Sequence, residues 1–475
     1  MSELLTPDIC VIGAGVGGLA VAATAVAFGV PVVLVEKAEM GGEHLTGAVP
    51  LKVLLAAAKH VEGLRQASPF GVIAPRLKVN FEKINDHIRG VIAAVAPNDS
   101  AERFAGLGVR VIKGTARFKD HRTVTVGDGI EIKARRFVIA SGSRPGIPQI
   151  PGLADAPYFT SETVFDLSSC PKHLIVIGAG PTGLELAQAF GRLGAAVTVL
   201  DAAKPLAGED PECAAIVLDQ LAREGVTVRA GAEIVQVHRT KAKVQLLLRT
   251  AEGEEKIEGS HLLIAAERVP NIEDLDLAAA GINPGAGGIV VDKNLKTTNK
   301  KVYAIGSVTD GGLDTTHAAI DHAGCVIRNA LLRMPVRVKA NEIPRVTYTA
   351  PELAHVGWTE AEARQRRVAF RVLRWPYREN DRAQAERQTQ GHIKVITTKG
   401  GKILGATIVG AEAGELITAW TLAISQGMNI RAFASLIVPH PTYGGIGKQA
   451  ALTYFASKLG SPWLRPVIAA LRLLG

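Results

Sequence analysis

Two glycine-rich turns, each followed by an acidic residue, are the parts of this sequence best suited to bind dinucleotides. In the first turn, Gly13, Gly15 and Gly18 form a GxGxxG pattern, and Glu36 follows 18 residues later. The first glycine allows a tight turn, the second lets a pyrophosphate approach the backbone, and the third lets helix and strand pack closely. The phosphates would lie on unpaired N–H groups at a helix N-terminus, and the carboxylate would accept hydrogen bonds from ribose hydroxyls.

The second turn repeats this pattern, with Gly178, Gly180 and Gly183 as its glycines and Asp201 again 18 residues later. A carboxylate at this position accepts from a ribose 2′-hydroxyl and repels a 2′-phosphate, which favours NADH over NADPH. Lys204 lies close by in sequence, so NADPH stays open as the alternative. Two such turns about 165 residues apart predict two different dinucleotides, FAD and NAD.

Each turn has the elements that it needs to bind a nucleotide. An apolar strand at 9–12 precedes the first turn, and an Ala-rich helix and a strand at 32–35 follow it; residues 174–201 repeat this order.

The chain has 475 residues, which suggests about three domains. It is 47% hydrophobic and 21% charged, with 50 glycines and only 5% aromatic residues. This composition excludes a disordered chain and favours an α/β fold, in which small residues let helices pack closely on parallel sheets.

Several other classes of protein are disfavoured. There is no run of about 20 apolar residues that could span a membrane, and no secretory signal is recognisable, so a cytoplasmic protein is expected. The net charge is +9, but the Lys and Arg residues are interspersed with acidic residues and no nucleic-acid-binding motif is present, so a nucleic-acid-binding protein is disfavoured. Cys10, Cys170, Cys213 and Cys325 are too far apart for a CxxC motif or a zinc knuckle, and no metal site is predicted.

Five further motifs follow in a fixed order. They are FVIASGSRPGIPQIPGL (137–153), AERVPN (266–271), VYAIGS (302–307), VTYTAPELAHVGWTEAEA (346–363) and HPTYGG (440–445). Together with the two turns, they resemble the pyridine nucleotide-disulfide oxidoreductases, a flavoprotein family that includes dihydrolipoamide dehydrogenase, mercuric reductase and the soluble transhydrogenase. The resemblance extends from Asp8 to about Lys458.

This resemblance implies an α/β architecture with two Rossmann-like dinucleotide-binding domains and a C-terminal α+β dimerisation domain. The FAD domain would comprise residues 1–152 and 271–343, the NAD domain residues 153–270, and the dimerisation domain residues 344–475. In relatives the active site is shared between subunits, so a homodimer is implied.

The thiols of the family's redox disulfide are missing. In relatives they lie just after the first ribose acid, in a segment similar to GGxCxxxGCxPSK. Here residues 41–52 read GGEHLTGAVPLK, which is one residue shorter, with His44 in place of the first cysteine and Ala48 in place of the second. A disulfide relay stores two electrons on sulfur, which histidine cannot do. We therefore predict that electrons leave the flavin without a redox disulfide.

The nicotinamide side retains the family's residues. Lys52 matches the lysine of the PSK motif, and Glu185 matches the glutamate that pairs with it. A cation beside flavin N5 stabilises the negative charge that arrives with hydride. Arg268 resembles the arginine of the GRxPN motif, although Glu267 replaces the usual glycine.

His440 matches the family's proton-transferring histidine, which the other subunit supplies. Relatives have a glutamate five residues later that orients this imidazole, but here the position is Gly445. Two roles for His440 therefore remain open: it protonates a non-thiol acceptor, or it lines the pocket.

The second FAD motif ends in Gly306 and Ser307, where relatives have an aspartate that binds the ribityl chain. Downstream, residues 314–324 predict a helix start near His317 and Ala318, aimed at flavin N1 and C2=O. The segment 114–116 resembles the one that touches the adenine. The predicted cofactor-binding set is completed by Lys37, Gly42, Thr115, Ala116, Ser141, Gly142, Thr182 and Thr316.

The tail at 459–475 extends beyond the usual end of the family. Its apolar residues fall on one helical face beside two arginines: Val467, Ile468, Leu471 and Leu474, with Arg465 and Arg472. Such a segment either anchors on an anionic membrane surface or packs on the dimer.

We predict an FAD-dependent NADH oxidoreductase that reduces a quinone or another small oxidant. The enzymatic alternatives are nicotinamide transhydrogenation and activity similar to dihydrolipoamide dehydrogenase. From another class, a catalytically degenerate flavoprotein that binds its cofactors as a sensor or structural subunit also remains open.

Overall fold

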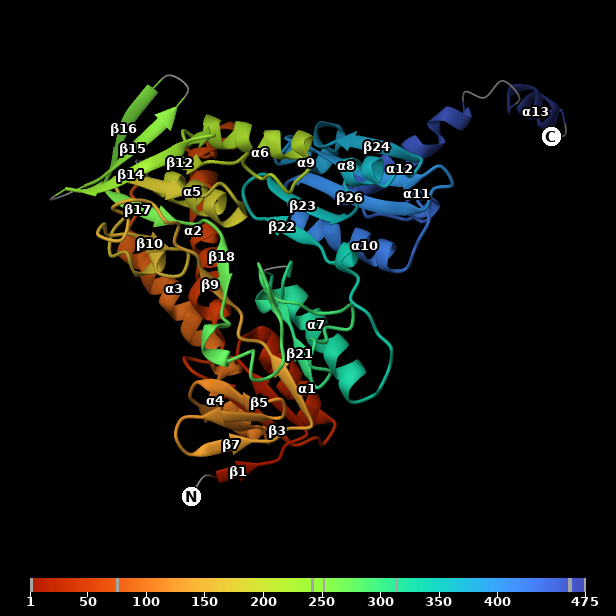
Figure 1. The fold of residues 1–475 in the computed structure, drawn as a ribbon. Helices are drawn as coiled ribbons and strands as arrows, with labels where there is room; N and C mark the ends of the chain where they lie inside the picture. The colour runs from red at the N-terminus through yellow and green to blue at the C-terminus, as the bar shows by residue number, and fades with distance from the viewer. Residues whose placement is uncertain are drawn as a thin grey trace. The chain divides into compact units, whose positions relative to one another are not determined.

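The computed structural model describes residues 3–73, 77–240, 243–250, 253–312, 315–459 and 464–473. It divides into two compact units (Figure 1), of which the first comprises residues 1–178, 189–200 and 232–339 and the second residues 179–188, 201–231 and 340–475. The stretch 153–270, predicted as the NAD domain, contributes to both units, and the division into three domains stays a prediction.

A five-stranded parallel sheet forms the first nucleotide fold, in the order β21-β8-β2-β3-β4. In chain order this is the 3-2-1-4-5 arrangement of a doubly wound α/β sheet, whose ligands bind at the carboxyl ends of the strands. The strands are β2 (Ile9–Ile12), β3 (Val32–Glu36), β4 (Arg110–Lys113), β8 (Arg136–Ile139) and β21 (Val302–Ala304).

Both faces of this sheet are buried at its centre, which explains why β2 and the first four residues of β3 are continuously apolar. Ile9 and Val11 of β2 pack against α1 (Val16–Ala27) and α7 (Thr316–Ala330). Cys10 and Ile12, which alternate with them, pack on the other side against a four-stranded sheet. That sheet contains β1 (Glu3–Leu5), β7 (Ile130–Ile132), β6 (Thr123–Val126) and β5 (Ala116–Asp120).

Three helices connect β3 to β4, and the first carries Lys52. They are α2 (Val49–Arg65), α3 (Phe81–Val95) and α4 (Ala101–Gly106). Two short strands, β9 (Ser143–Pro145) and β18 (Arg268–Pro270), pair antiparallel and bring two of the predicted motifs together. A second short pair consists of β19 (Pro284–Gly285) and β20 (Gly288–Ile289).

The second nucleotide fold has parallel strands in the order β10-β17-β11-β12 and an antiparallel sheet in the order β14-β15-β16. Helix α5 (Pro181–Leu193) follows β11, as the glycine turn predicts. The strands are β10 (Phe159–Thr160), β11 (His173–Ile177), β12 (Ala196–Asp201), β14 (Glu233–Arg239), β15 (Val244–Thr250), β16 (Gly253–Gly259) and β17 (His261–Ile264).

The second unit is built around an antiparallel sheet in the order β22-β23-β26-β25-β24. These strands are β22 (Arg345–Thr347), β23 (Glu352–Gly357), β24 (Phe370–Pro376), β25 (His392–Thr398) and β26 (Ile403–Gly410). The unit also contains β13 (Thr227–Ala230), α6 (Pro211–Arg223), α8 (Glu360–Gln365), α9 (Asp381–Ala385), α10 (Ala413–Ser425), α11 (Arg431–Ser435), α12 (Gly445–Leu459) and α13 (Leu464–Leu471). Within the part of the chain that the structure describes, no helix has the length and apolar character needed to cross a bilayer.

Candidate functional site

A cavity of about 470 Å³ lies at the carboxyl ends of the strands in the first nucleotide fold. Residues of the first glycine turn, the end of β3, the loops after β8 and β21, and the start of α7 line it. A smaller neighbouring cavity of about 60 Å³ includes residues 114–116 and shares Glu36, Lys37 and Ser141 with the larger one. This is where a doubly wound sheet binds its ligand.

Most of the residues predicted to bind FAD line these cavities. The larger cavity includes Gly13, Gly15, Glu36, Lys37, Gly42, Ser141, Gly142, Gly306, Ser307 and Thr316, and the smaller includes Thr115 and Ala116. Arg268, which was predicted on the nicotinamide side, also lines the larger cavity. Gly18, His317 and Ala318 line neither cavity, and neither does Lys52.

The first glycine turn is shaped to leave room for a ligand. Gly13 has φ +102°, and a Cβ there would lie 2.4 Å from the Ala140 carbonyl oxygen. A Cβ on Gly18 would lie 2.0 Å from the Gly13 carbonyl oxygen, so these two glycines are required for packing. In contrast, a Cβ on Gly15 would meet no described atom within 4 Å, and this residue lines the cavity. The second glycine therefore leaves open the space that a pyrophosphate needs.

The second turn has the same construction. Gly178 has φ +112°, and its Cβ would lie 2.3 Å from the Ala265 carbonyl oxygen, whereas a Cβ on Gly180 would meet open space. Thr182 and Gly183 lie in the first turn of α5, as predicted for a phosphate-binding helix.

The two ribose acids make equivalent hydrogen bonds to the backbone. Glu36 accepts from the Ala14 N–H at 2.6 Å and from the Ala38 N–H at 2.8 Å. Asp201 accepts at 2.7 Å from the N–H groups of both Ala179 and Ala203. Each bond uses one lone pair of one carboxylate oxygen, which leaves acceptor capacity for a ribose hydroxyl.

A chain of polar side chains lines the cavity beside Ser307. The Ser307 and Ser143 hydroxyls are 3.0 Å apart, and Nε of Arg268 donates to Ser143 Oγ at 2.8 Å. Arg268 also forms an ion pair with Glu162, with Nη2 and Oε1 2.8 Å apart. Arg268 therefore belongs to the cavity of the first nucleotide fold, and its predicted nicotinamide contact stays a prediction. Neither Ser143 nor Glu162 was predicted from the sequence. Ser143 lies inside the motif at 137–153, whereas no sequence pattern marks Glu162.

Helix α7 starts at the cavity, but the groups that face it differ from those predicted. Thr315 caps the helix by accepting from the Ala318 N–H at 3.4 Å, so this N–H already has a partner. Thr315, Thr316 and Ala319 line the cavity, whereas His317 and Ala318 do not. Asp314, the first residue of the predicted helix start, lies outside the described residues.

A histidine further along α7 supports the second FAD motif. His322 is buried, and its Nδ1 accepts from the Gly306 N–H at 3.2 Å. Burial lowers the pKa of this imidazole, which keeps the ring neutral and Nδ1 available as an acceptor. The sequence offered no sign of this role.

The segment that replaces the family's redox disulfide forms a π-helical turn, His44–Ala48, directly before α2. His44, Leu45 and Thr46 line the larger cavity, and no cysteine does. The chain's four cysteines are all described and all free: Cys10, Cys213 and Cys325 are buried, and Cys170 is partly buried. Burial raises the pKa of each thiol, so none is poised as a thiolate.

The predicted catalytic residues are distributed between the two units. Lys52 is an exposed residue of α2 in the first unit. Glu185 lies on α5 in the second unit, is 3% exposed, and accepts from the Tyr348 N–H at 2.8 Å. Their predicted pairing stays a prediction.

The predicted proton donor has a carboxylate nearby, although Gly445 replaces the expected glutamate. His440 is exposed, with Nε2 3.3 Å from Oδ2 of Asp381. Asp381 is the first residue of α9, far from HPTYGG in sequence, and no pattern pointed to it. Among the described residues, no group of three His, Cys, Asp or Glu side chains is arranged to hold a metal ion.

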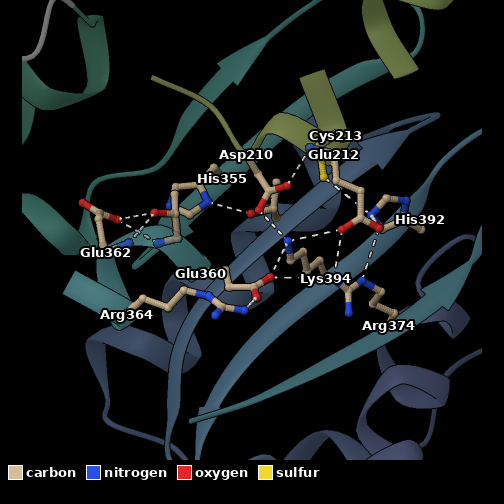
Figure 2. Close-up of polar contacts among 12 residues, drawn as sticks. Asp210, Glu212, Cys213, His355, Glu360, Glu362, Arg364, Arg374, His392 and Lys394 are labelled. Atoms are coloured by element: carbon tan, nitrogen blue, oxygen red, sulfur yellow. Dashed lines mark hydrogen bonds and ion pairs between the residues drawn. The ribbon is translucent and has the colours of Figure 1, made fainter. Parts of the chain in front are cut away.

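The loop that follows Asp201 ends at an ion cluster centred on the buried Lys394 and Asp210 (Figure 2). Lys394 of β25 is 4% exposed, and its Nζ lies 2.7 Å from Asp210 Oδ2, 2.8 Å from Glu360 Oε2 and 3.3 Å from Glu212 Oε2. Asp210 is the N-cap of α6. Burial opposes the charge of Lys394, but its hydrogen bonds to Asp210 and Glu360 outweigh this and raise its pKa.

The loop between Asp201 and α6 connects this cluster to the second glycine turn. Within the loop, the Leu206 N–H donates to the Ala179 carbonyl oxygen at 3.2 Å, and Arg345 pairs with Glu209 at 2.7 Å. The ribose acid, Ala179 of its glycine turn and the start of α6 are therefore fixed relative to β25 within the second unit. Sequence reasoning singled out none of these residues.

His355, on β23 near this cluster, makes stability depend on pH. Burial, with help from Arg345, lowers the pKa of its imidazole from 6.5 to about 4. Because folding favours the neutral ring, this contribution to stability is complete above pH 6.5 and is lost as the pH falls towards 4. On going from pH 7 to pH 5, we expect the free energy of unfolding of the wild type to fall by about 2 kcal/mol more than that of His355→Gln.

Urea denaturation at the two pH values measures this difference, with His87→Gln, at an exposed position of α3, as the control. The control should respond to pH as the wild type does. An equal loss of stability in His355→Gln and the wild type would contradict the assignment.

Comparisons with known proteins cover nearly the whole chain. Residues 7–323 match a family model described as pyridine nucleotide-disulphide oxidoreductase, and residues 343–451 match the dimerisation domain of that family. The chain is 34% identical to a mercuric reductase of Streptomyces lividans over 458 residues, covering 94% of this chain and 96% of that protein. It is 33% identical to a dihydrolipoyl dehydrogenase of Staphylococcus aureus over 453 residues, with the same coverage.

Two solved structures have the same fold. The LpdA protein of Mycobacterium tuberculosis aligns with a TM-score of 0.86 and 27% identity, covering 94% of this chain and 99% of that one. The HOCl-induced flavoprotein disulfide reductase RclA of Escherichia coli, solved as a Cu(II) complex, aligns with a TM-score of 0.84 and 26% identity, covering 95% and 100%. These matches confirm the fold class and the resemblance predicted from the motifs.

Proposed function

Since the chain belongs to the pyridine nucleotide-disulphide oxidoreductases, flavoenzymes that use FAD and NAD(P)H, we propose that it is an NADH oxidoreductase whose electron acceptor is not a thiol. The observation that carries this proposal is the His44–Ala48 turn. Three of its side chains line the cavity at the first glycine turn, and none of them contains sulfur. The turn therefore has no sulfur atoms that could store electrons as a disulfide and a dithiol.

The residues of the first unit fit FAD. The space beside Gly15 would take the pyrophosphate, Glu36 the ribose, and the smaller cavity at 114–116 the adenine. Bound FAD would supply the redox chemistry, because its ring system accepts a hydride and passes electrons to a second substrate. Ser307, which hydrogen-bonds Ser143, would hold the ribityl chain through its hydroxyl.

The other predicted residues take roles around the flavin. Lys52, oriented by Glu185, would stabilise negative charge near flavin N5. His440 of a second copy, with Asp381 beside it, would donate a proton to the acceptor or line its pocket. The match to the dimerisation domain supports the homodimer that this requires.

A quinone or another small oxidant is the proposed acceptor. Transhydrogenation between nicotinamides is the second candidate, because it also needs no thiol and both glycine turns are intact. The mercuric and dihydrolipoyl activities in the relatives' names are disfavoured here by His44 and Ala48.

An anaerobic titration of the purified holoenzyme tests this proposal. We expect complete bleaching of the flavin at one NADH per FAD, with no long-wavelength thiolate band. NADPH should need about tenfold more nucleotide, because Asp201 repels a 2′-phosphate. Uptake of two NADH per flavin with that band present would reveal a thiol pair and overturn the proposal. A flavin that NADH does not bleach would favour the degenerate, non-enzymatic alternative.

The tail remains open to the two roles predicted for it. Val467, Ile468 and Leu471 of α13 are 43–58% exposed, and no acidic residue follows Glu415 in the sequence. Trp463 and Leu474 lie outside the described residues. Flotation with anionic vesicles separates the two roles: a membrane anchor predicts recovery of the full chain and loss of a variant ending at residue 458, because apolar area and positive charge act together at such a surface. Equal recovery of both proteins would instead favour packing on the dimer.

A further inference from the structure

A second cavity lies away from the proposed flavin site and is lined by positive charge. Its volume is about 350 Å³, and it lies at the amino end of β8 and the C-terminal end of α7, opposite the glycine turn. Four cationic side chains line it, and no acidic side chain does: Arg135, Arg136, Lys296 and Arg333. Nothing in the proposed oxidoreductase function uses these residues.

The cationic groups of this cavity are only partly compensated within the protein. Arg135 pairs with Asp8 at 3.0 Å. Arg136, Lys296 and Arg333 make no ion pair with any residue that the structure describes. Like charges gathered around one cavity repel each other unless an anion lies between them.

The other nearby carboxylate, that of Asp292, is already engaged. It accepts from the N–H groups of Asn294 and Lys296 at 2.8 and 3.0 Å, and from the Asn294 side-chain amide at 3.2 Å. These bonds hold the loop that carries Lys296. Counting Asp8 and Asp292 against the four cations, the surroundings of the cavity keep an excess of positive charge.

The guanidinium of Arg136 is only partly satisfied by the protein. Nε of Arg136 is buried and has no hydrogen-bond partner among the described residues, while its Nη1 donates to the Arg135 carbonyl oxygen at 2.8 Å. A buried donor left unsatisfied costs about 1–3 kcal/mol, and more when it is charged. Because this nitrogen has almost no accessible surface, an oxyanion in the cavity that Arg136 lines would accept from the other N–H groups of the guanidinium.

We propose that this cavity binds the phosphate group of a small anion, either free pyrophosphate or a phosphorylated metabolite. Guanidinium groups recognise phosphate through several parallel N–H donors, and Lys296 adds a point charge above the Tyr303 ring, 5.8 Å from its centroid. The volume leaves room for a diphosphate with an organic group attached.

Isothermal titration of the FAD-loaded protein, at constant ionic strength and with saturating NAD⁺, tests the site. NAD⁺ keeps the probes away from the nicotinamide site, so failure of the proposed oxidoreductase function would not imitate failure here. The probes are pyrophosphate and ADP. We expect pyrophosphate to bind once per chain, and Lys296→Gln/Arg333→Gln to weaken it about tenfold or more. Tighter binding of ADP than of pyrophosphate would identify a phosphorylated metabolite as the ligand. Equal binding of the two probes would show that the site recognises the phosphate groups alone.

The matched control is Lys300→Gln/Arg337→Gln, which removes the same charge from exposed neighbours that do not line the cavity. It should bind pyrophosphate within about twofold of the wild type, since screened surface charges contribute little. Both double variants should keep their FAD content, which shows that they fold. Absence of binding to the wild type, or equal weakening by both double variants, would overturn the proposal.

Discussion

Replacing Gly15 with valine is expected to abolish stable FAD binding while leaving the apoprotein folded. Gly15 has φ −72° and ψ 176°, which valine adopts readily, and no described atom lies within 4 Å of the added Cβ. The new methyl groups would occupy the side of the cavity where the pyrophosphate meets the N-terminus of α1. We expect the affinity for FAD to fall by about 100-fold, which corresponds to ~3 kcal/mol. Flavin absorbance per chain after purification, followed by FAD titration of the apoprotein, measures the effect.

Two other glycines separate loss of the cofactor from loss of the fold. Gly90 of α3 also has open space around its Cβ position but does not line the cavity, so Gly90→Val should keep its FAD. Gly18→Ala places a methyl group 2.0 Å from a carbonyl oxygen, so this variant should instead lose folded protein. Normal flavin content in Gly15→Val would show that the cofactor does not lie on this turn.

Replacing Lys394 with methionine is expected to lower the free energy of unfolding of the second unit by about 3–5 kcal/mol. The substitution removes a buried cation and leaves Asp210 and Glu360 without their partner. In the wild type, the hydrogen bonds from Lys394 and Arg364 lower the pKa of Glu360 to about 2. Urea denaturation followed by circular dichroism measures the loss of stability.

The same substitution should also affect nucleotide binding. Because the cluster holds the loop after Asp201, we expect a raised KM for NADH in Lys394→Met with unchanged FAD content. Lys399→Met is the control, because Lys399 is exposed directly after β25. Lys394→Met/Asp210→Asn/Glu360→Gln should recover much of the stability, since it removes the unpaired charges together. Denaturation of Lys394→Met at the same urea concentration as the control would show that the cluster contributes nothing.

Local patterns determined much of the first nucleotide fold. The strand at Ile9–Ile12, the turn at Gly13 and the acid at Glu36 lie within 30 residues, and their spacing is dictated by backbone geometry alone. The same holds for β11, the turn at Gly178 and Asp201. The absence of thiols at His44 and Ala48 is likewise a property of the sequence, and it carries the proposed function.

Tertiary structure decided which distant residues support these turns. Glu162 reaches Arg268, Asp381 approaches His440, and Lys394 holds Asp210 across 184 residues of sequence. These side chains belong to ordinary-looking helices, strands and loops, and no periodicity or motif marks them. Which residues become their partners depends on sheet register and on the packing of elements that are distant in sequence. A glycine turn, in contrast, is specified by the few residues that form it. Local backbone constraints can therefore be inferred from neighbouring residues, but long-range ion pairs exist only once the chain has folded.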